Sequence, residues 1–344
     1  MKRRLVVAMA LAAWVCGGRG IAPAAEGSAP SVDVVMGDYE GTFTPAGGPA
    51  VKAEAKVVAE FAVGKDKSVR KTYRAVLNTL TEGGAGAVKA ELLGDLAGGE
   101  VALAGKGAAA ESKGLIANEK LTAEIKGDGG GKFDLKRVVR HSPTEGQKPP
   151  AGAVILLPYE PGKPTNLDAW QNKSWKILDD GSIQVGRRNN LTVQEFGDMR
   201  LHVEFKCPYM PEARGQGRGN SGVYSQDRYE VQILDSFGLP PKDNECGGIY
   251  QVSVPKVNAC FPPESWQTYD IEFHTQKFDT DGKVLGPATL TVHHNGVLIQ
   301  DKAQVPKETV AAGSKGAVKK GPLMVQDHGN PVCYRNIWLV ELDK

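Results

Sequence analysis

The chain has 344 residues with a formal net charge of +2 at pH 7, and 24% of its residues are charged. This near-neutral balance lacks the strongly basic surface that nucleic-acid binding needs, so no nucleic-acid partner is expected. The 42 glycines and 21 prolines favour strands and turns over long helices, and the length favours two domains.

The first segment, MKRRLVVAMALAAWVCGG, has a basic start followed by an apolar run that is too short to cross a bilayer. Ala22 and Ala24 supply the small residues of a cleavage site. Residues 1–24 are therefore interpreted as a secretory signal peptide, which predicts a periplasmic or extracellular protein. A lipoprotein anchor at Cys16 is the weaker alternative, because Val15 is larger than the small residue that such signals prefer. No later stretch is long and apolar enough to predict a membrane span.

Residues 31–140 form one compositional unit, in which alternating runs such as VKAEAKVVAEF and VRKTYRAVLNTL are separated by glycine clusters. This pattern predicts an antiparallel β-meander, although VKAEAKVVAEF also fits a short helix. The unit carries no recognisable catalytic motif, so we expect an accessory β-rich module. Residues 141–152, rich in proline, glycine and polar side chains, are predicted to form a linker at the domain boundary.

Residues 153–342 differ in texture and hold four of the five tryptophans. The runs MRLHVEFKC, WQTYDIEFHTQ and YRNIWLVEL alternate apolar and polar residues as half-buried strands do. The pair Asn295-Gly296 predicts a type I′ hairpin turn. Many short strands with almost no helical period predict a β-sandwich or jelly roll. The predicted fold class is therefore all-β, with a smaller meander module preceding the sandwich.

Four cysteines follow the signal peptide, Cys207, Cys246, Cys260 and Cys333, and their spacing matches no zinc ribbon. An exported protein can form disulfides, and Cys246 with Cys260 is the favoured pair because both flank one loop-rich stretch. Four separate buried thiols explain the cysteines at least as well.

The stretch RGQGRGNSGVYSQDRYEVQILDSFG, residues 214–238, carries the strongest indication of function. Its segment GRGNSG matches the G-x-G-x-x-G pattern, but the following residues read as a strand rather than a helix, which argues against a dinucleotide site. In YEVQILD, strand alternation places Glu230 and Gln232 on one face, and a bulge near Leu234 would return Asp235 to that face. Two carboxyl groups at such a spacing suit acid–base cleavage of a glycoside. A solvated outer face is the structural alternative.

The glycine-rich loop itself favours a binding site. Glycine lets the backbone approach a ligand closely. Arg218 and Asn220 can bind hydroxyl or carbonyl groups, and the aromatic Tyr224 lies four residues after Asn220.

A second polar motif lies near the C-terminus, in LMVQDHGNPVCYRNIWL. Asp327 and His328 fall where a strand breaks into a turn, and Arg335 lies on the next predicted strand. Asp327 could orient the imidazole of His328 as a base. A turn-capping aspartate beside a surface histidine explains the motif equally well. His293 and His294 are adjacent on one strand and point to opposite faces, which argues against a metal ion shared by the two.

Residues 153–342 resemble the 3-keto-disaccharide hydrolase domain family. The resemblance rests on FGDMRLHVEFKCP, the stretch at 214–238, NECGGIYQV, SWQTYDIEF, VHHNGV and QDHGNPVCYRNIW, in this order. It implies a concanavalin A-like jelly roll that acts on sugars oxidised at C3. Relatives usually open with a Leu-Phe-Asp-Gly turn, whereas this chain has LLPYEPGKPTNLDAW, so its first strand is expected to differ.

Roles in such a reaction are assigned from residue chemistry. Removal of the C2 proton followed by loss of the C1 oxygen needs a base, an acid, and a donor or cation for the enolate. The acid–base candidates are Glu230 and Asp235, with His328, oriented by Asp327, as an alternative base. The candidates for binding substrate are Arg218 or Arg335 for the enolate, Asn220, Gln232 and Tyr250 for hydroxyl groups, and Tyr224 in the cleft.

Two other functions stay open at this point. Glu230-Val-Gln-Ile-Leu-Asp235 is similar in spacing to the Glu-x-Asp-x-x-Glu strand of laminarinase-type glycosidases, but Gln and Asp replace the second and third acids. A non-catalytic, lectin-like module is the other alternative, because fold alone does not define function. The expected partner is an oligosaccharide or glycoside. No cofactor is predicted, a divalent metal bound by Glu230, Asp235, Asp327 and His328 is an open alternative, and the oligomeric state is not predicted.

Overall fold

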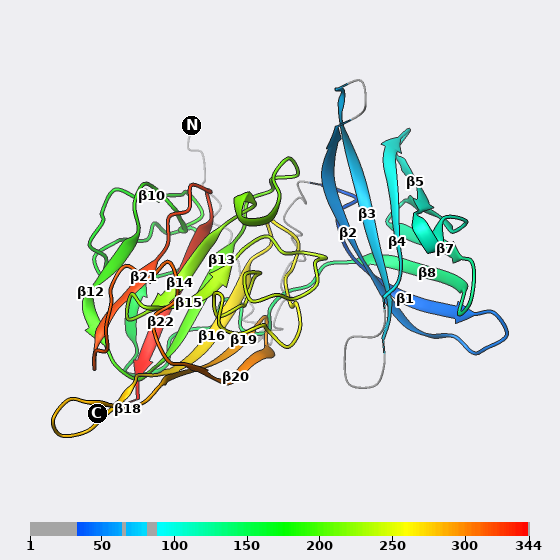
Figure 1. Ribbon diagram of the computed structural model, residues 1–344. Helices are drawn as coiled ribbons and strands as arrows, with labels where there is room; N and C mark the ends of the chain where they lie inside the picture. The colour runs from blue at the N-terminus through cyan, green and yellow to red at the C-terminus, as the bar shows by residue number, and fades with distance from the viewer. Residues whose placement is uncertain (1–32, 64–66, 81–87, 343–344) are drawn as a thin grey trace, which may run out of the picture. The chain divides into compact units, whose positions relative to one another are not determined.

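A computed structural model of the chain describes residues 33–63, 67–80 and 88–342 (Figure 1). The predicted signal peptide, residues 1–24 with Cys16, lies outside these residues. Strands dominate the described residues, as the sequence predicts for an all-β protein. No helix within them is long and apolar enough to cross a membrane.

In the described part of the chain, the first eight strands pair in sequence order and close into an antiparallel barrel. The barrel closes where β1 pairs with β8, with Thr42 opposite Asp134. The meander prediction is therefore confirmed, and VKAEAKVVAEF is a strand rather than a helix. The strands are β1 Gly37–Pro45, β2 Val51–Val63, β3 Val69–Thr79, β4 Val88–Ala97, β5 Glu100–Gly105, β6 Lys113–Ala117, β7 Lys120–Ile125 and β8 Gly131–Val138.

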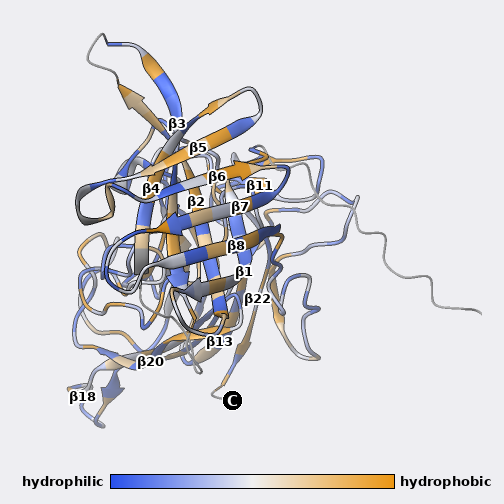
Figure 2. Cartoon of the chain, turned by 90° about the vertical axis from the view of Figure 1, so that its right-hand side faces the viewer, coloured by the Kyte–Doolittle hydropathy of each residue, from blue (hydrophilic) through white to orange (hydrophobic). Residues whose placement is uncertain are grey.

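The barrel is filled by its own side chains. Hydrophilic and hydrophobic residues are interleaved along strands such as β7 and β8 (Figure 2), and every second residue of β7 is buried. Tyr39, Tyr73 and Phe133 are at most 2% exposed and contribute aromatic rings to this interior. The alternation that predicted strands is thus the alternation between barrel interior and surface.

The second half of the described chain is a β-sandwich. Its larger sheet has the order β10-β11-β22-β13-β16-β19-β20 with β9 added beside β22, and its smaller sheet has the order β12-β21-β14-β15. A short β17–β18 pair completes it. The strands are β9 Val154–Leu157, β10 Lys176–Ile177, β11 Ile183–Gln184, β12 Asn190–Phe196, β13 Met199–Lys206, β14 Ser221–Ser225, β15 Tyr229–Ile233, β16 Gln267–His274, β17 Lys277–Phe278, β18 Val284–Gly286, β19 Ala288–His294, β20 Val297–Val305, β21 Gly321–Val325 and β22 Cys333–Glu341.

The two sheets pack face to face through aromatic side chains, as in other β-sandwiches. Tyr229 of the smaller sheet contacts Phe273 of the larger, with ring centroids 5.6 Å apart. Tyr334 on β22 reaches Ser221 on β14, and their hydroxyl oxygens are 2.7 Å apart. The predicted Asn295-Gly296 turn joins β19 to β20, with both residues at positive φ as a type I′ turn requires.

The predicted linker, residues 141–152, lies against the outer face of the larger sheet. The N–H of Gly146 donates to Glu204 at 2.6 Å, and the hydroxyl of Thr144 donates to Asp270 at 2.8 Å. His202 and Glu204 are therefore buried, although strand alternation predicted that they face solvent. A segment more than fifty residues away in sequence covers them, which the local pattern of β13 does not reveal.

Candidate active site

Glu230 and Gln232 project from the outer face of the smaller sheet. Their neighbours Val231 and Ile233 are fully buried in the core between the sheets, so strand alternation turns Glu230 and Gln232 the other way. In the antiparallel β14–β15 pair, Tyr224 lies opposite Glu230 and Gly222 lies opposite Gln232. The glycine-rich stretch and the Glu230 strand thus form one hairpin, as their closeness in sequence suggested.

Glu230 is 1% exposed, although it carries a carboxyl group. Burial raises its pKa from the ordinary value of 4.5 to about 7, and a hydrogen bond from Tyr224 opposes this rise. A carboxyl group that titrates near neutrality can both accept and return a proton at physiological pH. Gly222 makes room for it, because a Cβ at that position would lie only 2.5 Å from Glu230 Oε1.

Tyr224 is held between Glu230 and Gln326. Burial, and next the charge of Glu230, raise the pKa of the Tyr224 phenol, so it stays protonated. The amide Nε2 of Gln326 donates to the phenol oxygen at 2.8 Å, which leaves the phenol proton free to face Glu230. The backbone of Gln326 is fixed by its N–H bond to Gly222 at 2.9 Å, directly after β21. Sequence analysis gave Gln326 no role.

Gln216 joins Asn220 to Gln232. Its Oε1 accepts hydrogen bonds from Asn220 Nδ2 at 3.1 Å and from Gln232 Nε2 at 3.0 Å. Its own Nε2 donates to the carbonyl of Asn244 at 2.7 Å. Because both amide nitrogens are engaged, Asn220 and Gln232 are left with their side-chain oxygens. Gln216 was missed in the sequence, where only its place in the glycine-rich loop marks it.

Several buried oxygens of this cluster have no hydrogen-bond partner in the described part of the chain. They are Asn220 Oδ1, Glu230 Oε2, Gln232 Oε1 and Gln326 Oε1. A buried polar atom without a partner costs free energy, roughly 1–3 kcal/mol, so such a group of atoms needs an explanation. All four are acceptors, and a ligand with many hydroxyl groups would satisfy them. Two of the predicted binding residues, Asn220 and Gln232, are therefore placed beside Glu230.

Asp235 is not a second carboxylate on the Glu230 face. β15 ends at Ile233, so the expected strand bulge near Leu234 is not the feature that positions Asp235. Its Oδ2 accepts a hydrogen bond from Arg218 Nε at 2.6 Å, and both residues are buried. Burial raises the pKa of Asp235, and Arg218 opposes this. The sequence predicted separate roles for these two residues, Asp235 as an acid or base and Arg218 as a donor to the enolate. In the structure they are bound to each other as an ion pair.

The Asp327–His328 arrangement also differs from the prediction. Asp327 accepts hydrogen bonds from the backbone N–H groups of Arg188 and Gly329, each at 2.8 Å. Both carboxylate oxygens are thus used in loop structure, and His328 is exposed. The turn-capping alternative describes Asp327 correctly. Tyr250 lies closer to the site, since its N–H bonds the Glu230 carbonyl and its phenol is among the groups that raise the pKa of Tyr224.

Arg335 lies on the other outer face of the sandwich. Its neighbour Tyr334 points inward, so Arg335 points away from the smaller sheet. Its Nε is 2.6 Å from Glu204 Oε2, its Nη2 is 2.8 Å from Glu145, and its guanidinium stacks on Trp266. The prediction that Arg335 stabilises an enolate beside Glu230 is wrong, because the two side chains face away from each other.

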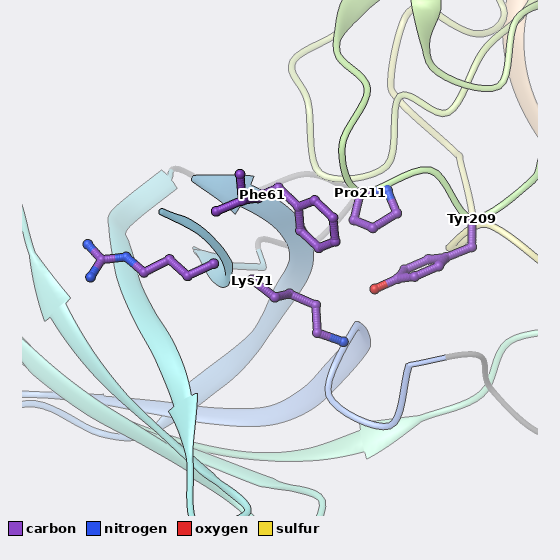
Figure 3. A pocket seen from close by; sticks show the side chains of 6 residues that line it. Phe61, Lys71, Tyr209 and Pro211 are labelled. Atoms are coloured by element: carbon purple, nitrogen blue, oxygen red, sulfur yellow. The ribbon is translucent and has the colours of Figure 1, made fainter. Parts of the chain in front are cut away.

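A cavity of about 350 Å³ lies elsewhere, and Figure 3 shows the side chains that line it. Phe61 and Lys71 come from β2 and β3, and Tyr209 and Pro211 come from the loop after β13. The Lys71 ammonium is 2.7 Å from Asp33, which also accepts a hydrogen bond from the Tyr209 phenol. The ammonium of Lys71 is neutralised by the carboxylate of Asp33, so this cavity offers no free charged group for a reaction.

The β-sandwich carries a carboxyl group with a pKa near neutrality, surrounded by unpaired acceptor oxygens. This arrangement fits a carbohydrate-active protein. The chain belongs to the 3-keto-alpha-glucoside-1,2-lyase-like domain family, whose model matches residues 159–340, just over half of the chain. This membership confirms the resemblance found in the sequence, and the family is hydrolase-like.

A crystal structure of a candidate glycosyl hydrolase from Parabacteroides distasonis ATCC 8503 is 34% identical, with a TM-score of 0.50, covering 56% of this chain and 85% of that one. Two further candidate glycosyl hydrolases from this organism are 20% and 21% identical, with TM-scores of 0.39 and 0.38. They each cover 52% of this chain and 90% and 95% of their own, and they are too distant to support an argument about function. No curated protein matches the chain.

Proposed function

We propose that this protein is an exported enzyme that cleaves the glycosidic bonds of sugars carrying a ketone at C3. One observation carries the proposal: Glu230 is buried, its pKa is raised to about 7, and its Oε2 has no partner in the described residues. The group is thus a base of suitable strength whose second oxygen has no hydrogen-bond partner in the described residues. The family, named for a lyase of 3-keto-glucosides, supports the same chemistry.

The reaction follows from the acidity that a ketone gives to the neighbouring carbon. Glu230, as the carboxylate, takes the proton from C2, and the electron pair of that bond forms the enolate of the C3 ketone. The enolate then reforms the ketone and expels the glycosidic oxygen from C1, which takes up a proton and leaves an enone. Addition of water across C1 and C2 gives the 3-keto sugar, so the net result is hydrolysis without any change in oxidation state.

The surrounding residues can be given roles that match their contacts. Tyr224, a neutral phenol beside Glu230, is the candidate acid for the leaving oxygen. The free oxygens of Asn220, Gln232 and Gln326 accept hydrogen bonds from sugar hydroxyl groups. Arg218 is the remaining candidate for the enolate, because its Nη2 has no partner in the described chain while its Nε holds Asp235.

A retaining glycosidase of the laminarinase type is less well supported. That mechanism uses two carboxyl groups about 5 Å apart, one as nucleophile and one as acid. Here the second predicted carboxyl group, Asp235, is bound to Arg218. A lectin-like module would need no base, so the raised pKa of Glu230 favours the enzyme over the binder.

The test compares a disaccharide with its 3-keto derivative, each incubated with purified protein while released sugar is measured. Cleavage of only the keto form supports the proposal, and cleavage of the plain sugar would replace it with ordinary hydrolysis. Binding without cleavage would make the protein a lectin. A keto substrate deuterated at C2 should react several-fold more slowly and lose its label to water, which direct hydrolysis would not cause.

A further inference from the structure

Three buried side chains that are distant in sequence meet behind the β15 strand. Cys246 lies in the loop after β15, Cys260 in the segment before β16, and His294 at the end of β19. One ligand atom from each can be chosen so that all lie within 4.8 Å of one another. Among the described residues, Cys246, Cys260 and His294 are the group of metal-ligating side chains that lie close enough together to hold an ion. The metal ligands considered from the sequence, Glu230, Asp235, Asp327 and His328, do not form such a group.

The imidazole of His294 has one nitrogen unused. Its Nε2 lies 3.0 Å from Gln267 Oε1, while Nδ1 is buried and without a hydrogen-bond partner in the described chain. A neutral imidazole with a free nitrogen and its other nitrogen held by an acceptor is the form in which histidine binds metals.

The thiols next to it are equally enclosed. Cys246, Cys260 and Cys207 are each at most 2% exposed. Cys246 Sγ lies 3.1 Å from the phenol oxygen of Tyr269 on β16. Cys207 is not part of the group whose ligand atoms lie within 4.8 Å of one another.

We propose that Cys246, Cys260 and His294 bind one zinc ion in a buried structural site. Tetrahedral zinc has bonds of about 2.3 Å to sulfur and about 2.0 Å to nitrogen, which places neighbouring ligand atoms roughly 3.5–3.8 Å apart. The three ligand atoms of this group lie within 4.8 Å of one another, about 1 Å wider than that spacing at most. Each thiol releases its proton to solvent as its sulfur binds, and nothing is oxidised or reduced.

The site would brace the candidate active site without touching the substrate. Cys246 directly precedes Gly247 and Gly248, which bond to the backbone of Gln232, the N–H of Gly247 at 2.9 Å and the carbonyl of Gly248 at 2.9 Å. An ion that ties this loop to β19 would fix the strand that carries Glu230. The Tyr269 phenol lies 3.1 Å from Cys246 Sγ and donates its proton to the carbonyl of Gln232 at 2.6 Å, so it links the cysteine to the same strand. The proposal does not depend on the proposed function.

The first test measures metal by mass spectrometry in the full chain, purified without chelator or reductant. The expected result is about one zinc per chain, and alkylation with peptide mapping should find Cys246 and Cys260 unlinked after unfolding with chelator. Stripping the zinc should lower the melting temperature by about 10 °C, and adding zinc back should restore it. A Cys246–Cys260 disulfide, or free thiols with no metal, would each overturn the proposal.

Variants separate the site from a general effect of losing a thiol. Cys260→Ser and His294→Gln should each reduce the zinc content to less than about a tenth. Cys333→Ser is the matched control, because Cys333 is also buried but lies outside the three-residue group, and it should keep its zinc. If the first two variants fail to fold, the cobalt-substituted wild-type chain decides. Its absorption spectrum should show sulfur-to-cobalt charge-transfer bands and the d–d bands of tetrahedral cobalt. A spectrum without these bands would refute the site.

Discussion

Replacing Glu230 with glutamine tests the central claim, because one buried carboxyl group is assigned both the chemistry and a cost in stability. Its pKa rises from 4.5 to about 7 on folding. At about 1.4 kcal/mol per pH unit, this corresponds to roughly 3 kcal/mol against the charged form in the folded state. Glutamine has nearly the same shape and carries no charge at any pH, so it removes this cost.

The direction of the pH dependence follows from the raised pKa. Below pH 4.5 both folded and unfolded chains hold the proton, and Glu230 imposes no charge penalty. As the pH rises to about 7, the unfolded chain loses the proton first, so stability falls and then stays low. Glu230→Gln should therefore be more stable than the wild type above neutral pH, by up to about 3 kcal/mol, and equal to it near pH 4.

Two measurements are needed on the same protein. Urea unfolding at about pH 5 and pH 8 gives the free energy of unfolding, and a pH–rate profile with a 3-keto disaccharide gives the activity. Wild-type kcat/KM should rise with an apparent pKa near 7, and Glu230→Gln should lose about 100-fold to 10,000-fold in rate. Glu272→Gln, the same change at a partly exposed ion pair on β16, should leave the rate and its pH midpoint unchanged. A Glu230→Gln variant that is fully active, or no more stable at pH 8, would refute the reasoning.

The remaining predictions address the neighbours. Tyr224→Phe removes the proposed acid and should lower kcat about 10-fold to 100-fold, with KM little changed, in steady-state assays. Gly222→Ala pushes its Cβ into the Glu230 carboxylate and should reduce kcat while the circular dichroism spectrum stays the same; normal turnover would show that the carboxylate position is unimportant. Glu204→Gln removes one of the two carboxylates that pair with the buried Arg335 and should cost about 1–3 kcal/mol in denaturant unfolding without moving the pH midpoint of activity. His328→Ala should change kcat/KM less than about threefold, and a larger loss would revive the histidine as base.

The fold was largely predictable because its strands follow a local rule. Alternation of apolar and polar residues gave the strands of both halves, and Asn295-Gly296 gave the turn of the β19–β20 hairpin. The burial of His202 and Glu204 was not predictable from β13, since the residues that cover them come from 142–147. The closure of the barrel likewise depends on β1 meeting β8, a pairing between strands far apart in sequence.

The site was predictable where its residues share one hairpin. Glu230, Gln232 and Tyr224 are brought together by the β14–β15 pairing, which alternation within 25 residues already implies. Arg335 was wrongly predicted to lie beside Glu230, because the sequence of its strand does not reveal which of the two sheets the strand joins. Gln326 reaches Tyr224 through the β14–β21 pairing, a long-range contact that no local pattern marks.

The chemistry of a 3-keto sugar explains why a single free carboxyl group could be enough. Hydrolysis of an ordinary glycoside builds positive charge at C1, so the enzyme must supply a second carboxylate to stabilise it or to activate water. Removal of a proton next to a ketone builds negative charge instead, and the ketone oxygen holds most of that charge. A site for this reaction needs one base, a neutral acid and hydrogen-bonding groups. Glu230, the protonated Tyr224 and the amide side chains match that list, whereas a carboxylate pair would repel the developing enolate. The pairing of Asp235 with Arg218 is consistent with the proposed reaction, because it leaves Glu230 as the single unpaired carboxyl group of the predicted acid–base pair.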